Sequence, residues 1–176
     1  MNKRKIIIGV AVLMCLPVVG LYLYHGFIGQ TDSWGKIVAY FDGAEYLGKT
    51  GVIIQKTEND CGPAVLKMIL DYYKIPSTSE ELRKRLLIRN GTTMLNLQYI
   101  ARLKGLEAQG WRYAFNDLTK LKLPVIAFVK RKHYVVITGI TKNQDIIVLD
   151  PEIGKLKYSH KRFNKIWKGE TLIFSK

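Results

Sequence analysis

The chain has 176 residues, with 28 Lys and Arg against 14 Asp and Glu, which gives a net charge of +14. This length leaves room for one domain and a short extra segment. The positive charge favours anionic neighbours such as lipid headgroups, acidic wall polymers or acidic peptides. Nucleic-acid binding is not expected, because no helix-turn-helix, zinc or aromatic-stacking motif accompanies the charge. Two cysteines, Cys15 and Cys61, exclude a disulfide framework, and no Cys/His cluster has zinc-ligand spacing.

The N-terminal segment predicts a membrane anchor. Residues 6–28 are almost wholly apolar, and 23 residues in a helix would reach about 34 Å, enough to cross a hydrocarbon core of about 30 Å. Basic residues fill positions 3–5. The positive-inside rule therefore predicts a cytoplasmic tip at 1–5, a single-pass span at 6–28 and an extracytoplasmic remainder in the cell membrane. A cleaved signal peptide and a buried soluble helix are the alternatives.

Residues 29–50 are rich in glycine and lack a sustained period. They predict a juxtamembrane linker, with a short helix at about 34–41. The domain is expected at 51–176, beginning with a short strand at 52–54. A helix at about 62–74 follows, since Val65, Leu66 and Ile69 recur at helical spacing.

Two more helices are predicted before the pattern changes. Ser77-Thr-Ser-Glu80 and Thr78-Ser-Glu-Glu81 both match the capping box and start a helix that runs to about residue 87. A third helix is expected at 94–104, where Gly105 ends it.

After residue 105 the hydrophobic period shortens toward two, which is typical of strands. Strands are predicted at 107–113, 124–130, 133–141, 146–149 and 171–174, with a turn at 150–154 and a short helix at 159–167. Helices followed by strands indicate an α+β fold, with N-terminal helices packed on an antiparallel sheet.

Four residues in this pattern fit nucleophilic catalysis. Cys61 stands at a helix start, where unpaired N–H groups favour a thiolate. A short turn joins the strands at 133–141 and 146–149, so His133 at the start of one is expected beside Asp150 at the end of the other. A cysteine nucleophile needs a base, a group that orients the base and an oxyanion donor. Gln55 is the candidate donor.

Each of these residues also has a plainer interpretation when taken singly. A buried cysteine is usually a small apolar residue, a histidine at a strand edge is usually polar surface, and Asp-Pro usually forms a turn.

Together, the motifs resemble one known family, the bacteriocin-processing cysteine peptidases that cut double-glycine leaders in peptide exporters. The resemblance covers about residues 52–174 and rests on Gln55-x5-Cys61-Gly62-Pro63-Ala64-x-Leu66, Gly91-Thr-Thr-x-x-Asn-Leu, Ala101-x3-Gly105-Leu106, Leu123-Pro124-Val125-Ile126, His133-Tyr134-Val135-Val136, Asp150-Pro151-x2-Gly154 and Phe163-x3-Trp167-x-Gly169.

The resemblance implies a papain-like fold and hydrolysis of a peptide bond. Cys61 would be the nucleophile, His133 the general base and acid, and Asp150 the orienting carboxylate. Gln55 and the Cys61 backbone N–H would form the oxyanion hole. No metal, nucleotide or other cofactor is expected.

The sequence lacks the G-x-x-x-x-G-K-[ST] motif of an exporter ATPase, so any export partner is expected on a separate polypeptide. Two other functions stay open. One is a non-catalytic peptide-binding module of the same fold, and the other is a cell-wall peptide hydrolase, which the outward topology and the charge would suit.

Overall fold

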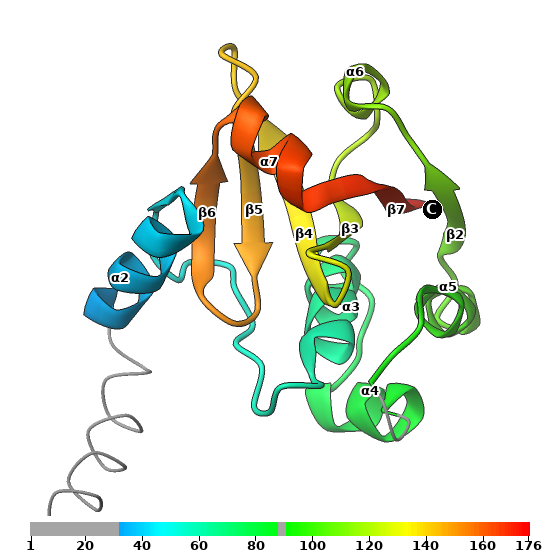
Figure 1. Cartoon of the computed structure of the whole chain (residues 1–176). Helices are drawn as coiled ribbons and strands as arrows, with labels where there is room; N and C mark the ends of the chain where they lie inside the picture. Colours follow the sequence, from blue (N-terminus) through cyan, green and yellow to red (C-terminus); the bar gives the residue numbers. More distant parts are fainter. Residues whose placement is uncertain (1–31, 88–90) are drawn as a thin grey trace, which may run out of the picture.

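The computed structural model describes residues 32–87 and 91–176, and an antiparallel sheet lies at their centre (Figure 1). The sheet has seven strands in the order β1-β6-β5-β4-β3-β7-β2. Their bounds are β1 (Ala44–Tyr46), β2 (Glu107–Arg112), β3 (Val125–Val129), β4 (His133–Ile140), β5 (Ile146–Asp150), β6 (Gly154–Tyr158) and β7 (Trp167–Ser175).

Helices cover both faces of this sheet. Their bounds are α2 (Asp32–Asp42), α3 (Cys61–Tyr72), α4 (Ser79–Leu86), α5 (Met94–Leu103), α6 (Phe115–Leu118) and α7 (His160–Ile166). One hydrophobic cluster joins α3, α4 and α5 to the sheet, and a second joins α2, α6 and α7 to it. In Figure 1, α7 crosses in front of the strands. The α+β class predicted from the order of the elements is therefore confirmed.

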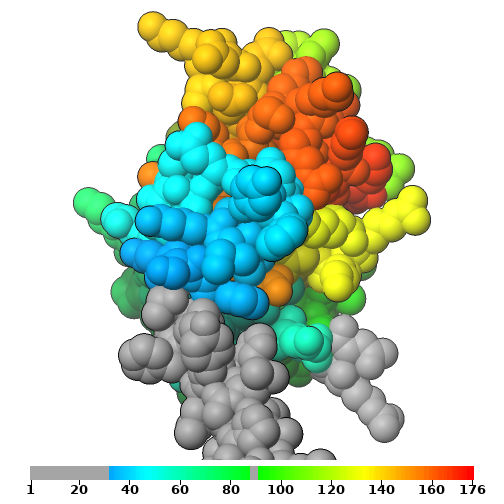
Figure 2. Space-filling model, turned by 60° about the vertical axis from the view of Figure 1, so that its left-hand side comes forward, coloured from blue at the N-terminus to red at the C-terminus, as the bar shows by residue number. Residues whose placement is uncertain are grey.

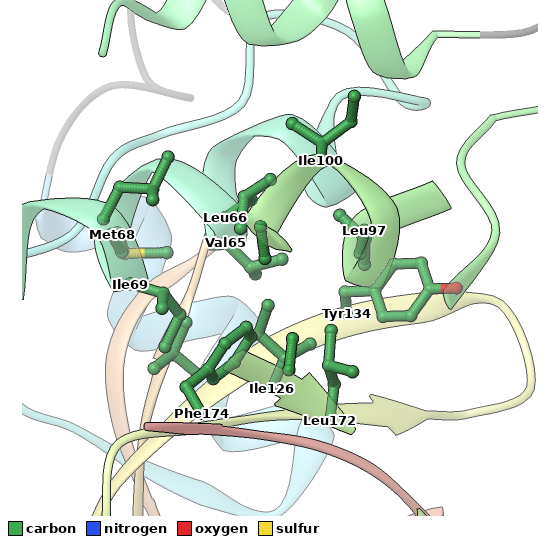
Figure 3. Packing of buried hydrophobic residues seen from close by; sticks show 14 of the residues in the cluster. Val65, Leu66, Met68, Ile69, Leu97, Ile100, Ile126, Tyr134, Leu172 and Phe174 are labelled. Carbon is green, nitrogen blue, oxygen red and sulfur yellow. The ribbon is translucent and has the colours of Figure 1, made fainter. Parts of the chain in front are cut away.

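The packing of α3 fixes the position of the helix start. Val65, Leu66 and Ile69 have no solvent exposure. These side chains lie over Ile126 and Phe174 of the sheet in Figure 3. Burying an aliphatic side chain of this size stabilises the fold by about 1.5–3 kcal/mol. The first residue of α3, Cys61, is thereby held at the edge of a tightly packed layer.

Most element boundaries agree with the sequence prediction. The helix predicted at about 62–74 is α3, which begins one residue earlier than expected, at Cys61. The capping box at Thr78 is confirmed, since its hydroxyl oxygen accepts a hydrogen bond from Glu81 N at 3.1 Å. The antiparallel hairpin of β4 and β5 is also as predicted.

The strand predicted at 52–54 is wrong. These residues belong to no ladder of the sheet. Val52 N–H donates to Lys49 O at 3.0 Å, and Ile53 N–H donates to the Met68 sulfur at 3.4 Å. Val52 and Ile53 are partly buried against the cluster that includes α3, whereas Ile54 is 41% exposed. Sequence periodicity does not distinguish packing on a helix from pairing in a sheet.

A strand was missed at β6. Its sequence, Gly-Lys-Leu-Lys-Tyr, buries Leu156 and Tyr158 and leaves the two lysines less buried. This is period-two alternation, but the run is short and rich in lysine, a residue depleted in strands. The last strand, β7, also begins at Trp167 rather than at residue 171.

The linker predicted at 29–50 needs correction, because residues 32–46 are part of the folded unit. β1 is an edge strand that pairs with β6, and α2 packs beside it. Gly35 allows this contact, since a Cβ at that position would lie 2.5 Å from the Tyr46 ring. Ala39, one turn later, is fully buried. Gly35 and Ala39 are thus the small residues that let α2 approach the sheet.

The anchor predicted at 6–28 lies outside the described residues. Within residues 32–87 and 91–176, no helix is long and apolar enough to cross a membrane.

Asp42, the last residue of α2, joins that helix to the rest of the fold. Its carboxylate pairs with Lys130 Nζ at 2.8 Å and Arg162 Nη2 at 3.2 Å, and it accepts a hydrogen bond from the Tyr158 hydroxyl. Burial raises the pKa of the carboxyl, but the hydrogen bonds from Lys130 and Tyr158 and the charges of Lys130 and Arg162 together hold the pKa below its ordinary value. The charged form of Asp42 therefore stabilises the fold.

Replacing Asp42 with alanine is expected to lower the free energy of unfolding by about 2–3 kcal/mol, because hydrogen bonds to charged groups are lost and Lys130 and Arg162 stay partly buried. Urea unfolding at pH 7 measures the change. Because folding lowers the pKa of Asp42, the wild type should exceed Asp42→Ala in free energy of unfolding by the full amount above the ordinary pKa of 3.8. This difference should disappear as the pH falls through the folded-state pKa.

The matched control is Asp117→Ala, which removes the exposed ion pair with Lys120 and should change stability by less than about 0.5 kcal/mol. Equal effects of the two substitutions would contradict the role given to Asp42.

Candidate active site

A cleft of about 810 Å³ opens between the start of α3 and the turn that joins β3 to β4. Gln55, Cys61 and His133 line it. The rings of Phe128 and Tyr134 also line it, with their centroids 4.9 Å apart. The three predicted site residues thus reach one cleft from three separate parts of the chain.

His133 and Asp150 form a buried pair beside this cleft. His133 Nε2 lies 2.9 Å from Asp150 Oδ1, and the two residues are only 7% and 1% exposed. Asp150 Oδ1 also accepts a hydrogen bond from Glu152 N–H at 2.8 Å, which fixes the carboxylate in the turn. The start of β4 and the end of β5 therefore bring these residues together, as the hairpin geometry predicts.

Cys61 lines the cleft together with His133, close enough for its side chain to raise the pKa of the imidazole. Because Asp150 already binds Nε2, Nδ1 is the ring nitrogen left for the sulfur. Burial lowers the pKa of His133, but hydrogen bonds to Asp150 and Cys61 and the negative charges of both groups raise it to about 10. The imidazole is thus held protonated at neutral pH between a carboxylate and a sulfur.

Gln55 is tied to the same turn as Asp150. Its backbone N–H donates to Pro151 O at 2.8 Å. The side-chain Oε1 is buried and accepts no hydrogen bond from the part of the chain that the structure describes. The Nε2 donor is then the end of the amide that can serve a group in the cleft. A carboxamide N–H that lines the same cleft as a thiol is suited to stabilising an oxyanion.

The start of α3 supplies further donors. The first N–H groups of a helix have no intrahelical acceptor, and Pro63 removes one of them without cost. Gly62 is needed for close packing, since a Cβ there would lie 2.6 Å from Thr92 Cβ. The backbone at Cys61 is therefore held in place and keeps its N–H free of a helical partner.

Asp60 stands at the N-cap of α3 and was not predicted from the sequence as a site residue. Aspartate at this position usually caps the helix, but Asp60 makes no side-chain cap bond. Its carboxylate is 2% exposed and instead lies 3.0 Å from Arg83 Nε of α4. Only the order Asp-Cys in the sequence hinted at this residue, and nothing in the sequence indicated its partner.

Basic residues form one rim of the cleft. Lys130, Arg131 and Lys132 make up the turn between β3 and β4. Lys130 and Arg131 have φ angles of 53° and 58°, in the left-handed region that non-glycine residues seldom adopt. Asp42 of α2 holds Lys130 at the base of this turn. The rim next to His133 is therefore cationic, and an ion pair with α2 holds it in place.

One group among the described residues has metal-ligand chemistry, namely His133, Asp150 and Glu152, whose ligand atoms lie within 4.8 Å of one another. A cation there would take the imidazole nitrogen that Asp150 now binds. The geometry favours the hydrogen-bonded pair of His133 and Asp150.

The chain belongs to the peptidase C39 family, whose model matches residues 49–176. Its sequence is 37% identical over 130 residues to the pediocin PA-1 transport/processing ATP-binding protein of Pediococcus acidilactici, covering 69% of this chain and 18% of that protein. It is 30% identical over 128 residues to an uncharacterised protein of Methanothermobacter thermautotrophicus, covering 72% and 89% respectively. The family predicted from the motifs is thus confirmed.

Solved structures agree with this membership. A double-glycine-motif protease from an AMS/PCAT transporter, in complex with its leader peptide, superposes with a TM-score of 0.67 at 35% identity, covering 70% of this chain and 89% of that one. The peptidase domain of Streptococcus ComA superposes with a TM-score of 0.65 at 28% identity, covering 70% and 96% respectively. The fold is that of these peptidase domains.

Replacing Asp150 with asparagine is expected to lower the pKa of His133 from about 10 toward the ordinary value of 6.5, because the charge that holds the proton on the ring is lost. Carbon-13 NMR titration of the histidine rings between about pH 5 and 11 measures it. His160→Gln identifies one of the other signals. A wild-type His133 that titrates near 6.5 would contradict the pairing described here.

Proposed function

We propose that this chain is a cysteine peptidase that removes a leader from a peptide through Cys61, His133, Asp150 and Gln55. The observation that carries the proposal is that the buried pair of Asp150 and His133 lies beside a cleft that Cys61 and Gln55 also line. Membership of the peptidase C39 family supports peptide-bond hydrolysis.

In the first half of the reaction, the Cys61 thiolate attacks the scissile carbonyl carbon. The developing oxyanion accepts hydrogen bonds from Gln55 Nε2 and the Cys61 backbone N–H. His133, protonated at neutral pH, gives its proton to the leaving amine as the C–N bond breaks. A thioester remains on Cys61.

In the second half, His133 takes a proton from water, which attacks the thioester carbonyl. The C–S bond breaks, the acid product leaves and the thiolate is restored beside the imidazolium. Asp150 keeps the ring oriented throughout, and no step uses a nucleotide.

The substrate class follows from the relatives. A transporter protease with a bound leader peptide and exporters that process bacteriocins are among the similar proteins. A peptide with a double-glycine leader is therefore the substrate that we propose, and a peptide exporter the partner that moves the product. The basic rim at 130–132 would favour a peptide with acidic residues near the cut.

We also propose that residues 6–28 anchor the chain in the cell membrane and that the catalytic domain faces outward. The apolar run and the basic residues before it support this arrangement.

The full-length protein in detergent is expected to cleave a synthetic double-glycine leader peptide, and Cys61→Ala is expected to abolish cleavage because the nucleophile is lost. Gln55→Ala should lower kcat by about 10²–10³, the usual effect of removing an oxyanion donor. Mass spectrometry of the products identifies the cut. Cys15→Ala, outside the described residues, is the matched cysteine control and should retain full activity.

Equal cleavage by the wild type and Cys61→Ala would refute the peptidase proposal. Binding of the leader without cleavage would indicate a peptide-binding module instead. Cleavage of peptidoglycan stem peptides, with leaders left intact, would indicate a wall hydrolase.

The orientation is tested with a single exposed thiol. Asn143 lies in the exposed turn between β4 and β5, so Asn143→Cys in a Cys15→Ala, Cys61→Ala background gives a reporter that burial does not hide. A membrane-impermeant maleimide should label it in intact cells. Labelling that requires lysis would show that the domain faces the cytoplasm.

A further inference from the structure

The outer face of α2 presents large apolar side chains to solvent. Ile37, Tyr40 and Phe41 are 49%, 79% and 81% exposed. Their spacing of three and four residues places them on one side of the helix, opposite the buried Gly35 and Ala39. Figure 2 shows α2, in blue, at the surface of the molecule.

This face serves no part of the fold described above. The contacts of α2 with the sheet use its opposite side, through Gly35 and Ala39. The helix also precedes the family match, which begins at residue 49. A cluster of exposed apolar side chains of this kind marks a surface that binds another protein or a membrane.

The sequence before α2 favours a membrane as the binding partner of this surface. The apolar run at 6–28 ends four Cα steps before Asp32, and four steps of extended chain reach at most about 14 Å. The headgroup zone of one leaflet is itself about 5–8 Å thick. If residues 6–28 span the membrane, α2 is therefore confined to the membrane surface.

The composition of α2 fits that surface. Aromatic rings beside aliphatic side chains partition into the boundary between headgroups and acyl chains, and Lys36 is exposed next to them. The positive charge of the whole chain adds attraction to anionic lipid.

We propose that α2 docks on the lipid surface through Ile37, Tyr40 and Phe41, and so fixes the catalytic domain against the bilayer. The inference rests on the anchor proposed above. Asp42 at the end of α2 pairs with Lys130 on the cleft rim, so docking of the helix also sets the position of the cleft. In Figure 2 the yellow segment around residue 130 lies beside α2.

The test places an NBD fluorophore on single cysteines of the full chain, in a Cys15→Ala, Cys61→Ala background, in vesicles of phosphatidylethanolamine and phosphatidylglycerol. NBD at Tyr40→Cys should emit at shorter wavelength than NBD at Asn143→Cys, and nitroxides near the lipid headgroups should quench it several-fold more strongly. Aqueous iodide should quench the two probes in the reverse order.

A matched variant tests the apolar face itself. Adding Ile37→Ser and Phe41→Ser to Tyr40→Cys should remove most of the wavelength shift, while the chain still floats with the vesicles. Flotation with equal iodide quenching at positions 40 and 143 would overturn docking and leave the anchor intact. Failure to float would overturn the anchor and docking together. A blue shift that no lipid nitroxide quenches, and that depends on protein concentration, would overturn docking in favour of contact with a second copy.

Discussion

The buried hydrogen bond between His133 and Asp150 is the interaction on which the site depends. Two buried charges are costly unless each satisfies the other, so the surrounding strands must hold the two side chains within hydrogen-bond reach. The antiparallel register of β4 and β5 does this, because it places the start of one strand beside the end of the other. The same contact fixes which nitrogen of the ring is left to face Cys61. Asp150 thus orients the imidazole and also contributes to holding its proton.

The site is assembled from segments that constrain one another. The backbone N–H of Gln55 donates a hydrogen bond to the carbonyl oxygen of Pro151, the residue directly after Asp150. The oxyanion donor and the orienting acid therefore share a single turn, and a shift of that turn would disturb both at once. Cys61 is positioned independently, by the packing of α3 on the sheet and by the contact of Gly62 with Thr92. A hairpin and a helix thus meet at the cleft.

The sequence predicts those parts of the structure that local pattern controls. The helix that starts at Cys61 and the proximity of His133 to Asp150 both follow from periodicity and a short turn. The assignment of 52–54 as a strand failed because an apolar run is equally suited to packing on a helix, where Ile53 bonds to Met68. β6 was missed because its lysines mask the alternation that buries Leu156 and Tyr158. The packing of α2 against the sheet depends on the close contact between Gly35 and the Tyr46 ring, a tertiary contact that the local sequence pattern does not predict.

The ion pair of Asp60 with Arg83 has a consequence for how the helix start is kept available. A carboxylate at an N-cap ordinarily bonds to the N–H of the second or third helical residue, and because Pro63 has no N–H, Gly62 supplies the donor within its reach. Asp60 makes no such bond, and its carboxylate pairs instead with Arg83, which does not line the cleft. The acidic residue next to Cys61 is thus neutralised from α4, through a single side chain, and the first turn of α3 stays free of a carboxylate cap.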